Sequence, residues 1–180
     1  MNVMSMSEHL SYEDSCRALQ NEGIVHPGDI PPMPVKPPRY DDEDLGVEFF
    51  RTRLADAKIE HLTLPRTFFG RSEIRNTSFK DTDLNESTAN WNDFIDVDFG
   101  SADLSRSDFR ACIFERVRFI GAQLAGVDFR HCSFTDCDFS GADVGGVKFT
   151  KETGASLRFS SEQQHVIDWQ DDDGEEPEGG

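Results

Sequence analysis

Large apolar residues recur at every fifth position through the middle of this 180-residue chain. Between Phe49 and Phe149 this register holds twelve of the 15 phenylalanines, whereas random placement would give it roughly three, so an internal repeat is indicated. The other positions of each unit are mostly polar, except that the position two residues before the large one is small or β-branched. These small positions are Thr77, Thr82, Val97, Ala102, Ser107, Cys112, Val117, Ala122, Val127, Cys132, Cys137, Ala142 and Val147.

A period of five fits neither the helical period of 3.6 nor the strand period of 2, so an ordinary helix or strand cannot turn every fifth residue inward. A coil that turns a corner every five residues can do so, with the large and the small residue inside and the other three on the outer wall. Four units would close one coil, and neighbouring coils would hydrogen-bond at about 4.8 Å like strands. Residues 49–151 are therefore expected to form an all-β solenoid of about four to five coils.

The units carry a family resemblance. The sequences TDLNE at 82–86, ADLSR at 102–106, AQLAG at 122–126, CDFSG at 137–141 and ADVGG at 142–146 resemble the pentapeptide-repeat family. Its motif is Ala-(Asp/Asn)-Leu-x-x, with Phe common at the centre. The resemblance implies a right-handed quadrilateral β-helix, and it implies little about activity because fold and function are separate properties.

The two ends of the coil are expected to be capped, because an open end would expose unpaired backbone groups and a ring of phenylalanines. Residues 1–48 are predicted to be an N-terminal arm, with a short helix over 7–22 and a Pro-rich linker over 27–38. Residues 49–64 form either an irregular first coil or a short helix. The five-residue register fails at Gly154, and residues 160–163 resemble a capping box that opens a helix with Val166, Ile167 and Trp169. We therefore expect a C-terminal cap over 152–170 and a disordered acidic tail over 171–180.

The net charge of −17 and the pI near 4.5 argue against direct binding to nucleic-acid phosphates. No apolar run approaches a membrane span, and no leader peptide is evident, so a cytoplasmic protein is expected. The charge is uneven, because residues 152–180 carry nine acidic residues and one basic residue.

Folding the sequence in twenties predicts which charges share a wall of the coil. One acidic wall is centred on Leu84, Leu104, Leu124 and Val144, and a second on Ile74, Phe94, Phe114 and Phe134. A third wall is net basic, with Arg71, Arg110, Arg130, Lys148 and Lys151 against Asp108 and Asp128. Trp91 follows Ala89, which stands where a large residue belongs. Either Trp91 or a local bulge fills the resulting hole, or Trp91 is an exposed anchor.

Nothing in the sequence points to catalysis. The five histidines lack metal-ligand spacing, and there is no Gly-rich phosphate loop or nucleophile turn, so no enzyme, cofactor or metal is expected. Cys112 and Cys132 lie one coil apart, close enough for a disulfide, but packed free thiols are the stronger expectation in a reducing compartment.

These features favour a protein that acts by binding another protein. The leading hypothesis is an inhibitor, an immunity protein that neutralises a cationic, nuclease-type secreted bacterial toxin, and it is expected to be a monomer or weak dimer. The resemblance also implies an alternative, a DNA mimic that protects a type II topoisomerase (DNA gyrase), and a plain scaffold is a third possibility. Either the N-terminal arm or the walls of the coil supply the contacts. The candidate partner-binding residues on the walls are Asp83, Asp103, Asp143, Asp93, Asp96 and Trp91.

Overall fold

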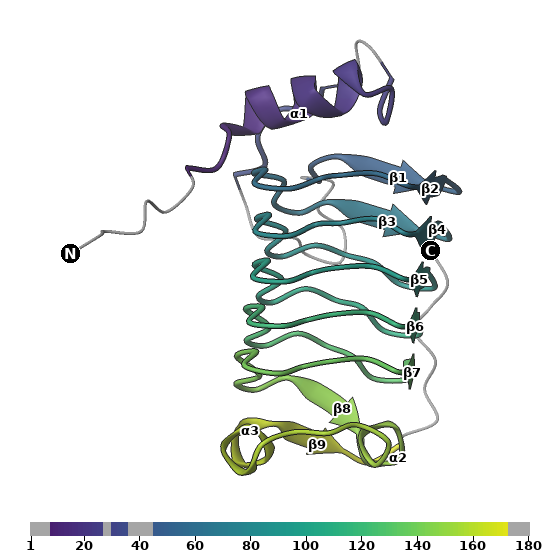
Figure 1. Cartoon of the computed structure of the whole chain (residues 1–180), viewed down its shortest axis with the longest axis vertical. Helices are drawn as coiled ribbons and strands as arrows, with labels where there is room; N and C mark the ends of the chain where they lie inside the picture. Colours follow the sequence, from purple (N-terminus) through teal and green to yellow (C-terminus); the bar gives the residue numbers. More distant parts are fainter. Residues whose placement is uncertain (1–7, 27–29, 36–44, 173–180) are drawn as a thin grey trace, which may run out of the picture.

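The structure, a computed structural model, describes residues 8–26, 30–35 and 45–172. It is a β-solenoid of about six turns, with helix α1 (Tyr12–Asn21) lying across one end (Figure 1). The predicted fold is therefore confirmed, and the coil is longer than the four to five turns expected. The strands are short and pair in parallel with the strand one turn away: β1 (Glu48–Phe50) with β3 (Phe68–Gly70), and β8 (Lys148–Thr150) with β9 (Asp168–Gln170).

One wall of the coil carries a continuous five-stranded parallel sheet, in the order β2-β4-β5-β6-β7. Its strands pair with a shift of one turn, so that Phe94 faces Phe114 and Phe114 faces Phe134. The other walls are joined by single parallel bridges with the same shift. The strands of the sheet are Arg53–Ala55, Glu73–Arg75, Asp93–Ile95, Ile113–Glu115 and Ser133–Thr135.

The corners of the coil are made by a repeated backbone conformation. Every fifth residue from Arg51 to Gly146 has a positive φ, which reverses the local chain direction. This conformation costs an L-residue roughly 1–2 kcal/mol and costs glycine little, so each non-glycine corner must be stabilised by the coil around it. Trp91, with a φ of 60°, is such a corner.

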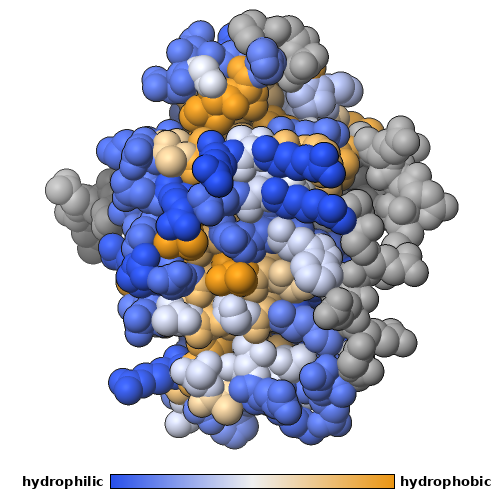
Figure 2. Space-filling model, turned by 90° about the vertical axis from the view of Figure 1, so that its right-hand side faces the viewer, coloured by the Kyte–Doolittle hydropathy of each residue, from blue (hydrophilic) through white to orange (hydrophobic). Residues whose placement is uncertain are grey.

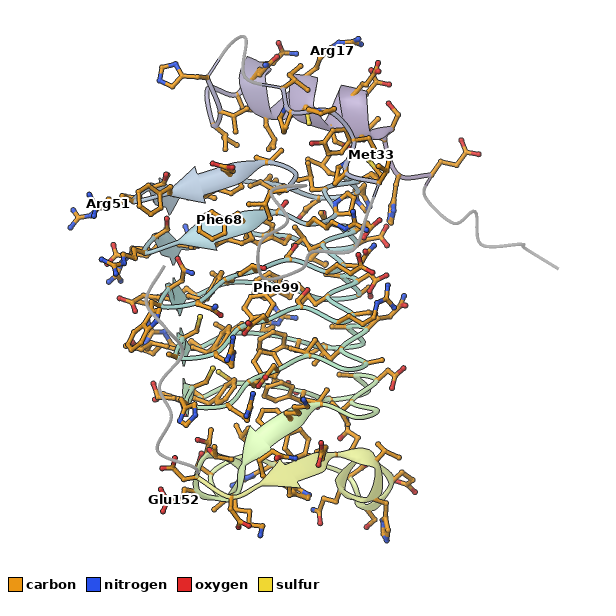
Figure 3. The ribbon with its side chains drawn as sticks, turned by 180° about the vertical axis from the view of Figure 1, so that it is seen from behind. Arg17, Met33, Arg51, Phe68, Phe99 and Glu152 are labelled. Atoms are coloured by element: carbon orange, nitrogen blue, oxygen red, sulfur yellow. The ribbon has the colours of Figure 1, made fainter. Side chains whose placement is uncertain are left out.

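The interior is filled by stacked rings and by the small residues beside them. Phe119 lies between Phe99 and Phe139, with ring centroids 5.4 Å and 4.7 Å away, and Figure 3 shows Phe99 within this core. Several of the polar small residues are accommodated because they donate to a carbonyl of the previous turn. Thr82 Oγ1, for example, donates to the carbonyl of Ile59 at 2.6 Å, and Cys132 Sγ donates to a carbonyl at 2.9 Å. All four cysteines are free thiols, as expected.

The N-terminal end of the solenoid is a coil whose strands pair with the next turn. Residues 49–64 form a complete coil, and the ring of Phe49 stacks on Phe69 at 5.1 Å, so the helical alternative is wrong. Helix α1 covers this coil with its buried face, as predicted. Its N-cap is Ser11, so the helix begins later than the predicted range of 7–22. The Thr63 amide donates to Ser15 Oγ at 2.9 Å and fixes the helix to the coil.

At the C-terminal end the five-residue register is interrupted at Gly154 but does not end there. It resumes at Phe159, whose ring lies 5.3 Å from that of Phe139, and at Trp169, which pairs with Phe149. The end of the register was therefore placed too early. Gly154 ends the short helix α2 (Lys151–Gly154), and a Cβ there would lie 1.9 Å from the Trp169 ring.

The predicted capping box opens helix α3 (Ser161–Val166), with reciprocal hydrogen bonds between Ser160 and Gln163. Gln163 Nε2 also donates to the carbonyls of Phe139 and Ala142 at 2.9 Å and 3.0 Å, which satisfies acceptors of the last coil. The expectation that Trp169 belongs to this helix is wrong, since it lies in β9. Most of the predicted linker and the predicted tail from residue 173 onward lie outside the described residues.

Candidate acidic protein-binding groove

The aspartates that precede the large inward residues have a structural task in each unit. Asp83, Asp103 and Asp143 each accept, through Oδ1, the amide N–H two residues further on, at 2.9–3.1 Å. A short side chain that accepts from its own backbone in this way stabilises a turn, which explains why Asp suits this position. The second carboxylate oxygen of these residues has no hydrogen-bond partner among the described residues.

A groove of about 770 Å³ opens where the segment before α1 meets the acidic wall. Asp81 lies at its edge between two histidines, with Oδ1 3.3 Å from His9 Nε2 and Oδ2 2.8 Å from His61 Nδ1. These contacts tie the N-terminal segment to the side of the coil. The lining residues are Glu8, His9, Asp81, Asp83, Ser101, Asp103 and Gln123.

Three carboxylates of this groove form no ion pair within the part of the chain that the structure describes: those of Glu8, Asp83 and Asp103. Asp83 and Asp103 are paired in register one turn apart, about 4.8 Å along the coil. Two like charges at such a distance repel, by about 1 kcal/mol in water and by more where water is partly excluded. A cationic group between them would relieve this repulsion.

Glu86 lies on the same wall but is already neutralised. Arg66 Nε approaches it at 2.8 Å and Arg106 Nη2 at 3.1 Å, from the turns on either side. Burial raises the pKa of Glu86, but the hydrogen bonds from the two arginines outweigh it and leave the pKa below its usual range. Glu86 therefore stabilises the wall and offers little charge to a partner.

The predicted site residues do not gather in one place. Asp83 and Asp103 share the groove, whereas Asp143 lies two turns from Asp103 on the same wall, with Gln123 between them. Asp93 and Asp96 lie on the five-stranded sheet, at the start of β5 and just after it. Asp96 is bound by Arg116 through two contacts of 2.6 Å and 2.8 Å, so it is engaged within the wall.

The pKa of Asp93 is shifted in the opposite direction to that of Asp96, which Arg116 lowers. Burial raises the pKa of Asp93, the nearby Glu73 raises it further, and Arg75 opposes both. Its ionised form is therefore poorly stabilised on this wall.

Trp91 lies outside the coil with 38% of its surface exposed. The space beside Ala89 is taken by Phe94, whose ring lies 5.9 Å from Phe69 and 5.7 Å from Phe109. The interpretation that Trp91 fills this space is therefore wrong, and the exposed alternative holds. On the wall predicted to be net basic, Arg110 and Arg130 each pair with the aspartate two residues earlier.

Glu8, His9 and Asp81 are groove residues that sequence reasoning missed. The segment that carries Glu8 and His9 lies outside the repeat, so no periodicity placed it against the coil. Across the described residues, no cluster of metal-ligating side chains is present, and no helix is long and apolar enough to cross a bilayer.

Residues 92–169 match the model of the pentapeptide repeat region. This part of the chain is therefore similar to the pentapeptide-repeat family, and the match covers 78 of the 180 residues. No curated protein sequence is significantly similar to it. Proteins of this family are generally non-catalytic.

The solenoid fold is shared with a solved structure of low sequence identity. Rfr23 from the cyanobacterium Cyanothece 51142 is 12% identical, with a TM-score of 0.55 over 58% of this chain and 85% of that one. QnrB1, a plasmid-mediated fluoroquinolone resistance protein, is 22% identical with a TM-score of 0.41, over 71% of this chain and 64% of that one. At these identities the likeness concerns the fold alone, so the groove has to be interpreted from its own chemistry.

Proposed function

We propose that this protein is a non-catalytic inhibitor that binds a basic protein domain through the groove between its N-terminal segment and the acidic wall. The observation that carries the proposal is the convergence of the Glu8, Asp83 and Asp103 carboxylates on one groove without a basic partner in the described residues. Both the N-terminal arm and the wall then contribute contacts.

The chemistry of the groove suits lysine or arginine side chains of a partner. A carboxylate held by its own backbone is already oriented, so little side-chain entropy is lost when a cation binds it. A guanidinium can donate two parallel hydrogen bonds to one carboxylate, and charge-assisted hydrogen bonds of this kind are the stronger ones. The spacing of about 4.8 Å between turns would place two such cations side by side.

Within this proposal, the biological role is that of an immunity protein. A nuclease-type toxin must present a basic surface to nucleic acid, and an acidic protein that covers that surface blocks the substrate. Such an inhibitor protects the cell that makes the toxin, so we place it in the cytoplasm.

The alternative, a DNA mimic that protects DNA gyrase, has less support from the charge pattern. A DNA mimic needs a continuous track of negative charge, and Gln123 interrupts the column formed by Asp83, Asp103 and Asp143. Glu86 and Asp96 are neutralised by arginines within the walls.

The test compares two immobilised baits in extracts of the native organism. Asp83→Asn with Asp103→Asn removes both charges, while the amide oxygen can still accept the turn hydrogen bond. Asp143→Asn is the matched control, because it changes an equivalent turn aspartate outside the groove. We expect a basic protein to be captured by the wild type and the control, and to be lost from the double variant.

The binding rate gives a second readout. Exposed charges steer association and are screened within about 10 Å at 0.1 M salt, so the double variant should associate more slowly with a flatter salt dependence. Equal capture and equal association rates for all three baits would contradict the proposal. Capture of a gyrase subunit in place of a basic toxin would favour the alternative.

A further inference from the structure

A second surface of the molecule carries the opposite charge. Arg51, Arg71, Trp91 and His131 occupy the same corner of the coil, twenty residues apart or a multiple of it, and Lys151 at the start of α2 follows His131 by twenty residues. We call this line the Trp91 edge. At its upper part a groove of about 300 Å³ is lined by Arg51, Arg53, Arg71 and Trp91, together with Thr52, Ser72, Glu73 and Asp93. Figure 3 shows Arg51 projecting away from the coil next to Phe68. The wall beside this edge faces the viewer in Figure 2, where strongly hydrophilic and apolar surfaces adjoin.

The arginines of this upper groove are exceptional among those of the coil. Arg51, Arg53 and Arg71 form no ion pair with any carboxylate of the described residues. The other arginines on the walls of the regular coil each pair with a carboxylate: Arg66, Arg75, Arg106, Arg110, Arg116, Arg118 and Arg130. Glu73 and Asp93 also line this groove, and Glu73 is paired with Arg75. In a chain with a net charge of −17, three adjacent arginines that form no ion pair with the described residues outnumber these two carboxylates and form a surface suited to an acidic ligand.

Exposed aromatic rings accompany these arginines. The Arg51 guanidinium lies 5.1 Å from the centroid of the Phe50 ring, and Phe50 is 50% exposed. Trp91 adds a second exposed ring to the groove. Arginines beside rings offer a ligand both charge and apolar contact, which is the usual composition of an interface anchor.

The C-terminal end of the described chain meets the lower part of the same edge. Asp171 Oδ1 lies 2.5 Å from Lys151 Nζ, and Asp172 Oδ1 lies 3.7 Å from His131 Nδ1. His131 is one turn closer to Trp91 than Lys151 is. From Asp171 to Asp172 the chain therefore runs along the Trp91 edge in the direction of the arginines.

The sequence beyond Asp172 has the charge and the length to reach them. Residues 173–180 contain Asp173, Glu175, Glu176 and Glu178 and no basic residue. Eight extended residues span at most about 26–29 Å. From His131, Arg71 is three turns away and Arg51 four, which corresponds to about 14–19 Å along the coil.

We propose that the acidic residues 173–180 are an intramolecular ligand of the Arg51–Arg53–Arg71–Trp91 surface. Tethering at Asp171 and Asp172 gives this segment a high effective concentration at the surface, which a separate acidic molecule would have to overcome. The segment thereby screens a basic patch of an acidic protein. This inference concerns a different face from the acidic groove and does not depend on the proposed function.

The test uses a chain that ends at Asp172 and a synthetic peptide of residues 173–180. Peptide binding is followed by Trp fluorescence at low ionic strength. We expect saturable binding to the shortened chain, at least tenfold weaker at 0.5 M salt, and at least tenfold weaker binding to the full chain. Both proteins also contain Trp169, which contributes to the fluorescence. The control is therefore Trp91→Phe, which must abolish the change in fluorescence if that change comes from Trp91.

The arginine variant Arg51→Gln with Arg53→Gln and Arg71→Gln, made in the shortened chain, should lose peptide binding while its circular dichroism spectrum stays unchanged. Equal binding of the peptide to the full and shortened chains would overturn the proposal, as would unchanged binding to the arginine variant. Binding within one chain does not depend on protein concentration. A shift of the Trp91 emission when the full chain is diluted would therefore also overturn the proposal, because it would mean that the segment binds a second copy of the chain.

Discussion

The inward and outward positions of the same five-residue unit follow different rules. Inward, the chain repeats one solution: stacked rings such as Phe99, Phe119 and Phe139, beside small side chains that bond to the previous turn. Outward, individual positions differ: Asp96 beside the five-stranded sheet is held by Arg116, whereas Asp83 on the acidic wall forms no ion pair with the described residues. The interior is shared by all turns and must be uniform, whereas each wall position contacts only its immediate neighbours.

This difference separates stability from recognition. A change inside the coil should disturb the contacts of three successive turns, and a change on the wall should disturb one local pairing. Recognition can therefore be placed on the walls at little cost to the fold. Four substitutions test this contrast, from the largest expected effect to the smallest.

Phe119→Ala should lower the free energy of unfolding by about 3–5 kcal/mol, because it leaves a cavity between two stacked rings. Denaturant unfolding measures this effect. Asp103→Asn is the wall control and should change the value by less than about 0.5 kcal/mol. Similar losses for both would contradict the division between interior and wall.

Gly154→Ala should cost about 1–3 kcal/mol, because the added methyl would lie within 2 Å of the Trp169 ring and would force the last turn apart. Gly145→Ala is the matched control on the wall, where the nearest atom would be Asp143 Oδ1 at 3.3 Å. The thermal unfolding midpoint compares the two. An equal shift would mean that the C-terminal turn is not packed as the regular coil is.

Glu86→Gln should destabilise the wall by about 1–2 kcal/mol at pH 7, because Arg66 and Arg106 lose a shared charged acceptor. The lowered pKa of Glu86 means that its contribution is present above the unfolded-state pKa and is lost as the pH falls through the native pKa. The difference from the wild type should therefore shrink in acid. A pH-independent difference in urea unfolding would speak against a charge effect.

Asp93→Asn should act with the opposite sign and the smallest size. The raised pKa of Asp93 means that the native state binds this proton more tightly than the unfolded state does, so stability falls as the pH rises through the unfolded-state and then the native pKa. Removing the charge should stabilise the protein at pH 7 by less than about 1 kcal/mol, with no gain in acid. Unfolding at pH 7 and pH 3 checks this, and a loss of stability at pH 7 would refute it.

Much of the fold could be predicted because the residue type at each inward position identifies the repeat directly. The period of five, the inward Phe and Leu, and the small residues beside them identify the coil and its core without any long-range information. The same reasoning missed the resumption of the register at Phe159 and Trp169, because the intervening unit is replaced by a short helix around Gly154.

The candidate sites could be predicted only in part. Folding in twenties placed Asp83 and Asp103 on one wall, and the structure agrees. It could not show that Asp96 is held by Arg116 or that Trp91 stays outside, since these outcomes depend on which rotamers the neighbouring turns allow.

The sequence by itself determined the solenoid, its four walls and the content of its interior, because every inward position repeats the same local requirement. Only the tertiary structure decided where the non-repeating ends lie. The segment carrying Glu8 and His9 lies against Asp81, and Asp171 and Asp172 lie against Lys151 and His131. Those contacts arise from single polar pairs between distant parts of the chain, which leave no periodic trace in the sequence.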